Sequence, residues 1–163
     1  MKKALALGNE SFVQLIESDC YFVDKTPYIK PLMESGVYVQ LITRPRRFGK
    51  SLFLDMLRRF LAVNPEAPGD ISLQEKLFHG LKIREDTIFC ERFMGKVPVL
   101  YLTFKAVEGP TFEWAYSILG LRLAAVARKH AWLLASPHLS EKDKADRRRF
   151  GTDEFMTDPA KSV

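Results

Sequence analysis

The segment RPRRFGKSL, residues 44–52, contains the residue types that hold a phosphate group. A P-loop is written G-x-x-x-x-G-K-[ST]; Gly49, Lys50 and Ser51 match its end, whereas Arg44 stands at its first glycine. In such a loop the glycine allows close approach of the backbone, the lysine reaches the β- and γ-phosphates, and the hydroxyl joins the coordination sphere of Mg²⁺. The segment therefore indicates either a nucleotide site or a basic surface turn that matches by chance.

The elements expected on either side of this loop favour the nucleotide site. Residues 37–43, VYVQLIT, form an apolar, β-branched run that is typical of a strand covered on both faces. Residues 51–62, SLFLDMLRRFLA, carry apolar side chains at helical spacing. A loop between a strand and a helix directs free N–H groups and the helix dipole toward one anion. We predict that the site comprises Arg46, Arg47, Phe48, Gly49, Lys50 and Ser51, with the two arginines facing either phosphates or a partner.

The rest of the chain predicts an α/β class. A second apolar run, VPVLYLTF at 97–104, is expected to be a strand parallel to the first, and Thr111 is expected to cap a long helix through about Leu134. Other helices are expected from Thr26 to Gly36, twice within 73–95, and after Ser140. The predicted architecture is a P-loop NTPase-like layered fold, a parallel sheet flanked by helices. We divide the chain into a leading segment 1–36, a core 37–135, and a polar helix with a frayed tail at 136–163.

Three stretches, YFVDKTPYIKPLME, LITRPRRFGKSLFLDML and VPVLYLTFKAVEG, resemble the opening of the predicted AAA-ATPase-like proteins. These are bacterial and archaeal P-loop proteins whose longer members usually carry a C-terminal PD-(D/E)XK nuclease-like domain. Their loop reads R-P-R-R-F-G-K-S, so Arg44 fits the family. The resemblance covers about residues 8–150 and implies ATP and Mg²⁺ as cofactors, Lys50 as catalytic residue and Ser51 as metal ligand. It also marks Asp24 and Lys25 as signature positions, without assigning them a role.

A Walker B element, an apolar strand ending in an acid, is missing from the sequence. The run at 97–104 ends in Thr103, Phe104 and Lys105, and the acids Asp153 and Glu154 follow the polar stretch RRRFGT. Such an acid holds Mg²⁺ and helps to position the attacking water. We therefore expect an incomplete fold that resembles an N-terminal fragment and binds ATP with little or no hydrolysis.

Composition leaves a second function open. The 163 residues carry a net charge of +5, which favours anionic partners in general. The alternative is a basic interaction module for nucleic acid or protein, with Arg147, Arg148 and Arg149 as further contacts. The lack of a signal-peptide core, of a membrane span and of paired cysteines (Cys20 and Cys90 are far apart) favours a cytoplasmic protein. The histidines, His79, His130 and His138, are too widely separated to suggest a triad or a metal site.

Overall fold

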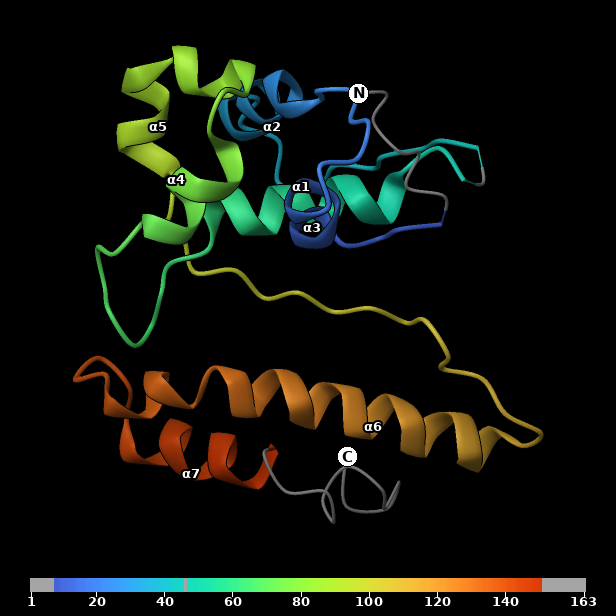
Figure 1. The fold of residues 1–163 in the computed structure, drawn as a ribbon. Coiled ribbons are helices and arrows are strands. Elements are labelled where there is room, and N and C mark those ends of the chain that lie inside the picture. Colours follow the sequence, from blue (N-terminus) through green and yellow to red (C-terminus); the bar gives the residue numbers. More distant parts are fainter. Residues whose placement is uncertain (1–7, 46, 151–163) are drawn as a thin grey trace. The chain divides into compact units, whose positions relative to one another are not determined.

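The computed structural model describes residues 8–45 and 47–150, and the chain forms two compact units. Unit 1 spans Met1–Val99 and unit 2 spans Leu100–Val163. The predicted segment boundaries at residues 36 and 135 stay a prediction. The helices of unit 1 are α1 (Phe12–Glu17), η1 (Thr26–Tyr28), α2 (Ile29–Glu34), α3 (Lys50–Leu61), α4 (Ser72–Phe78), η2 (Lys82–Glu85) and α5 (Thr87–Phe93) (Figure 1). Those of unit 2 are α6 (Phe112–Lys129), η3 (Ala131–Ala135) and α7 (Glu141–Phe150).

The predicted parallel sheet, and with it the α/β class, is wrong. The described residues contain no sheet, and the strand-like contact found there is a single parallel bridge between Ala62 and Val97. Residues 37–43 lie outside the helices, and all of them except Ile42 are solvent-exposed, with Val39 84% and Leu41 86% exposed. An apolar, β-branched run favours extended backbone, but a strand also needs a neighbour to take its hydrogen bonds. Among the described residues neither 37–43 nor 97–104 belongs to a sheet, and Val97 forms the single bridge.

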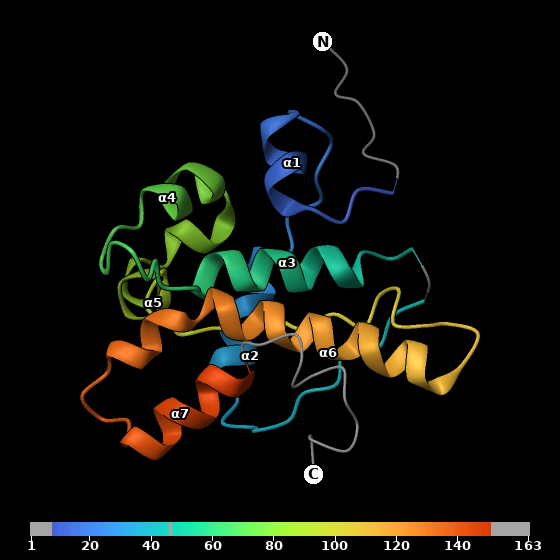
Figure 2. The same ribbon diagram turned by 90° about the horizontal axis from the view of Figure 1, so that it is seen from below.

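Unit 1 is built around α3. Its buried side chains, among them Phe53, Met56 and Phe60, pack with aromatic residues of α1, α4 and α5. The ring centroids of Phe60 and Phe78 are 5.2 Å apart, and those of Phe12 and Phe78 are 5.0 Å apart. Figure 2 shows α1 lying beside α3. The core of unit 1 therefore holds α3, the helix that follows the basic loop, against its neighbours.

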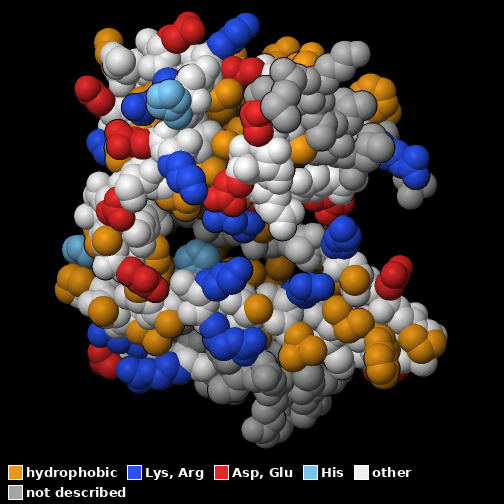
Figure 3. Space-filling view, viewed as in Figure 1, with side chains coloured by type: hydrophobic (Ala, Val, Ile, Leu, Met, Phe, Trp, Pro, Cys, Tyr) orange, Lys and Arg blue, Asp and Glu red, His pale blue; other side chains and the backbone are white. Residues whose placement is uncertain are grey.

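Unit 2 consists of α6, η3 and α7, and little of it is buried. The buried residues of α6 are Gly120 and Ala124. Trp114 is 61% exposed, and Figure 3 shows hydrophobic side chains gathered over the N-terminal part of α6. This helix is apolar nearly all round, a pattern that predicts burial on every side. In the described part of the chain, most side chains of α6 are instead exposed or only partly buried.

Several expected helix starts are confirmed. Thr111 caps α6, its hydroxyl accepting from Trp114 N at 3.3 Å, and Ser140 exchanges hydrogen bonds with Asp143 at the start of α7. Thr26 differs, because its hydroxyl does not cap the helix that begins there but donates to Asp24 Oδ1 at 2.7 Å. The N-terminus of η1 therefore depends on a side-chain contact that the Thr-Pro pattern does not encode.

Candidate functional site

The basic loop turns sharply into α3 at Gly49. Gly49 is the N-cap residue of α3 and has φ +72°, in the left-handed region where a side chain adds strain. Arg47 also has a positive φ, +67°, and Phe48 N donates to Pro45 O at 3.4 Å. The helix begins at Lys50, directly after Gly49. The loop thus delivers the chain to a helix N-terminus, as the G-K-S spacing predicts.

Lys50 bridges the loop from within. Its ammonium donates to the carbonyl oxygens of Arg44, at 2.5 Å, and Pro45, at 3.3 Å. These partners are neutral, and among the described residues no carboxylate pairs with Lys50. Ser51 is exposed in the first turn of α3. The lysine charge and the serine hydroxyl are therefore both available to an anion and its metal ion.

A cavity of about 340 Å³ lies between this loop, α3 and segment 21–25. Two cations, Lys25 and Arg47, line it, and no acid is among its lining residues. The ammonium Nζ of Lys25 lies 3.9 Å from the point that a Cβ on Gly49 would occupy. Two cations beside the positive end of a helix make the cavity attractive to an anion. The remaining lining residues are aromatic or aliphatic, apart from Gly49 itself: Leu15, Tyr21, Phe22, Val23, Phe48, Leu52, Phe53 and Met56.

The structure brings most of the predicted site residues together. Arg47, Phe48 and Gly49 line the cavity, and Lys50 and Ser51 follow directly in α3. Arg46 lies outside the described residues. Arg44, at the position of the first P-loop glycine, lies with its guanidinium 5.5 Å from the centroid of the Phe53 ring. Its side chain thus packs over α3, and its carbonyl receives Lys50.

Asp24 has a structural role that the sequence did not reveal. Its Oδ1 accepts from Thr26 N at 2.9 Å and its Oδ2 accepts from Lys82 N at 2.9 Å. Partial burial alone would raise the pKa of Asp24, but the hydrogen bonds from Lys82 and Thr26 outweigh it and hold this pKa below its ordinary value. Thr26 Oγ1 in turn accepts from Ile83 N at 3.2 Å. Asp24 therefore ties the segment before Lys25 to η2.

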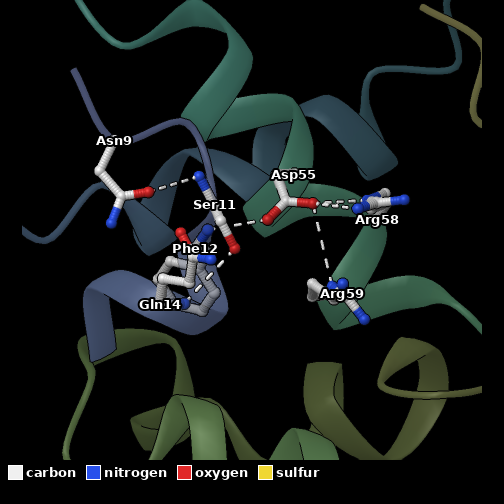
Figure 4. Close-up of polar contacts among 7 residues, drawn as sticks. All are labelled: Asn9, Ser11, Phe12, Gln14, Asp55, Arg58 and Arg59. Atoms are coloured by element: carbon white, nitrogen blue, oxygen red, sulfur yellow. Dashed lines mark hydrogen bonds and ion pairs between the residues drawn. The ribbon is translucent and has the colours of Figure 1, made fainter. Parts of the chain in front are cut away.

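Sequence reasoning missed Asp55, a buried carboxylate on α3 (Figure 4). Its Oδ2 accepts from Phe12 N at 2.8 Å, and its Oδ1 accepts from Arg58 Nε at 2.6 Å. Arg59 Nε lies 3.9 Å from the same Oδ1. Asp55 thus satisfies a free N–H at the start of α1 and fixes α1 against the helix that carries the loop. An acid within the apolar stripe, with arginines three and four positions later, is the signal that identifies it.

The described residues show no other cluster suited to metal or thiol chemistry. No group of three or more His, Cys, Asp or Glu among them is arranged to hold a metal ion. Cys20 and Cys90 are free thiols. Burial raises the pKa of the Cys90 thiol, whose Sγ donates to Ile83 O at 3.2 Å, so Cys90 is an unreactive core residue. No helix in the described part of the chain is long and apolar enough to cross a membrane.

A family model of predicted AAA-ATPases matches residues 6–151, nearly the whole chain. The chain belongs to this family. Over 104 residues it is 38% identical to an uncharacterized protein from the vnfD 5' region of Azotobacter chroococcum mcd 1. That match covers 63% of this chain and 17% of the relative, so the chain spans only a small part of the relative's length. No solved structure matches the chain.

Proposed function

We propose that this member of the predicted AAA-ATPase family binds a nucleoside triphosphate, ATP with Mg²⁺, at the loop 44–51 and the cavity beside it. The observation that carries the proposal is a cavity lined by Lys25 and Arg47, and by no acid, at the N-terminus of α3. Free N–H groups at a helix N-terminus and nearby cations are the groups that hold phosphate. The family membership agrees with this chemistry.

The residues at the loop fit the phosphates and the metal ion. Gly49 leaves the backbone open to close approach, and the Lys50 ammonium can exchange its carbonyl partners for phosphate oxygens. Mg²⁺ keeps several waters and takes one or two protein ligands together with phosphate oxygens. The exposed hydroxyl of Ser51 is suited to be such a ligand. Bound Mg²⁺ would neutralise phosphate charge.

The apolar part of the cavity fits a nucleobase. Tyr21 and Phe48 are exposed aromatic residues of its lining, 59% and 62% exposed. Aromatic faces stack on bases with little sequence preference. This favours a nucleotide over a simple anion, because inorganic phosphate would leave these side chains without a ligand.

We expect binding with little or no hydrolysis by this chain. Phosphoryl transfer needs a group that orients water. In the described part of unit 1, Asp24 is held by Thr26 and Lys82, and Asp55 by Phe12 and Arg58. Neither carboxylate lines the cavity. Phosphate release by the purified chain should therefore stay near its background rate.

Titration calorimetry with Mg-ATP on wild type and Lys50→Ala tests the proposal. Loss of one charge-assisted contact to phosphate costs roughly 1.5 to 3 kcal/mol, so Lys50→Ala should weaken binding more than tenfold. Lys142→Ala, which removes an exposed lysine of α7, is the matched control and should bind as wild type. Circular dichroism of each variant checks that the helices persist. Equal affinity in wild type and Lys50→Ala would refute the proposal.

The alternative of a basic nucleic-acid module predicts a different pattern. Binding through charge alone falls steeply with added salt and tolerates the loss of one lysine. Of the basic run 147–149, only Arg148 has a described side chain, and it is exposed. Salt-sensitive binding of an oligonucleotide by both wild type and Lys50→Ala, without Mg-ATP binding, would favour this alternative.

A further inference from the structure

Lys25 extends into the cavity from a segment far from the loop in sequence. Its ammonium Nζ lies beside Gly49, and the side chain is half-buried. The neighbouring acid, Asp24, directs its two oxygens to Thr26 and to Lys82 N. Among the described residues no carboxylate lies within ion-pair distance of Lys25. In the described part of the chain, Lys25 therefore forms no ion pair with Asp24.

This position is unfavourable for a cation unless an anion joins it. The N-terminus of a helix carries partial positive charge, and α3 begins directly after Gly49. Arg47 lines the same cavity, so a second positive charge lies nearby. Like charges that lie close together repel one another, and no carboxylate of the described residues is within ion-pair distance of Lys25 to offset this. An anion that reaches Lys25, Arg47 and the first turn of α3 together would remove this cost.

The position of Lys25 is fixed by contacts on either side. Tyr28 N donates to Lys25 O at 3.2 Å. Asp24, the residue before Lys25, accepts a hydrogen bond from Lys82 N and is thereby held against η2. Segment 24–28, which includes η1, is therefore anchored to η2. The backbone that carries the Lys25 side chain is held in place by these contacts. Ordering the lysine in advance lowers the entropy that a ligand must spend to bind it.

We propose that Lys25 is a second phosphate-binding lysine of this site and contacts the phosphate chain of the nucleotide together with Lys50. This inference rests on the proposed function and adds a residue outside the G-K-S motif. Asp24 is then a positioning residue, because it acts on the ligand only through the placement of Lys25.

Amine labelling of the wild-type chain tests the contact without a mutation. An amine-acetylating reagent is applied with and without Mg-ATP or Mg-tripolyphosphate, and mass spectrometry measures acetylation at Lys25, Lys50 and Lys82. We expect both ligands to protect Lys25 and Lys50 and to leave Lys82, an exposed lysine of η2 outside this cavity, unchanged. Protection of Lys25 by Mg-ATP and not by Mg-tripolyphosphate would overturn the phosphate contact.

The outcomes separate the inference from the proposed function. Protection of Lys50 without Lys25 refutes the role of Lys25 and leaves nucleotide binding intact. No protection at either lysine, with ligand at millimolar concentration, refutes both.

Variants give the second readout, the Kd for Mg-ATP. Lys25→Ala should raise this Kd about tenfold, the size of one charge-assisted hydrogen bond, whereas Lys25→Arg should stay within about threefold of wild type because it keeps the charge. Lys142→Ala, at an exposed position of α7, is the control with the same loss of charge. A Kd unchanged in Lys25→Ala but raised in Lys50→Ala refutes the inference alone. Should Lys25→Ala fail to fold, the labelling of the wild-type chain decides.

Discussion

Unit 1 and unit 2 contain similar apolar residues but bury them very differently. Phe60 of α3 is fully buried, whereas Leu121 of α6 is 44% exposed. The hydrophobic cluster of the molecule lies within unit 1, and in unit 2 α6 buries only Gly120 and Ala124. An amphipathic helix such as α3 has one apolar stripe, which the neighbouring aromatic residues cover. Apolar composition alone buries nothing; the surrounding elements must supply the partners.

The largest expected effect is on the core of unit 1. Phe60→Ala leaves a cavity among packed aromatic rings and should cost about 3 to 5 kcal/mol of unfolding free energy. Leu121→Ala in α6 should cost less than about 1 kcal/mol, because the side chain is already half in solvent. Hydrogen exchange in peptides from α3 and α6 measures the loss in each unit separately. Similar losses for the two variants would show that the units are buried to a similar degree.

A somewhat smaller effect is expected from the buried carboxylate of unit 1. Asp55→Ala removes the acceptor of Phe12 N and the buried carboxylate that Arg58 contacts, and should cost about 3 kcal/mol. Asp143→Ala, which removes an exposed acid at the start of α7, should cost about 1 kcal/mol or less. Urea titration followed by circular dichroism compares the two variants. Equal costs would mean that Asp55 is more hydrated than its burial indicates.

The same contrast explains which predictions from the sequence are correct. The start of α3 after Gly49 and the caps at Thr111 and Ser140 are confirmed, because each depends on residues within one turn. The predictions of strands at 37–43 and 97–104 are wrong, because a sheet depends on hydrogen-bond partners that are distant in sequence. Local signals identify helix ends, whereas an apolar run leaves its partner undefined.

The candidate site likewise contains residues that a local motif predicts and residues that only a tertiary contact brings together. Gly49, Lys50 and Ser51 follow from a short motif, and the structure places them at the start of α3. That Lys25 lies beside Gly49 does not follow from any spacing, since 24 positions separate them and a tertiary contact joins them. Asp55 likewise pairs with Phe12 across two helices. Contacts of this kind can be identified only from the three-dimensional structure.

The smallest expected effect is that of Asp24 on how the unfolding free energy of unit 1 depends on pH. Because the pKa of Asp24 is lowered in the folded protein, its stabilising effect is present above the ordinary value of 3.8 and is lost as the pH falls through the lowered value. Wild type should therefore lose more stability between pH 7 and pH 3 than Asp24→Asn does. Glu91→Gln, an exposed change on α5, is the control. Unfolding free energies at the two pH values measure the difference; an equal loss in wild type and Asp24→Asn would contradict the hydrogen-bonded role of Asp24.

Hydrogen exchange of the wild-type chain with and without Mg-ATP tests most directly whether unit 1 holds the nucleotide site. Bound phosphates should slow exchange at the loop 47–51, where backbone N–H groups at the start of α3 gain acceptors, and in segment 21–25. Peptides from α6 and α7 should exchange at the same rate in both samples. Protection confined to unit 2, or no protection anywhere at saturating Mg-ATP, would contradict the account.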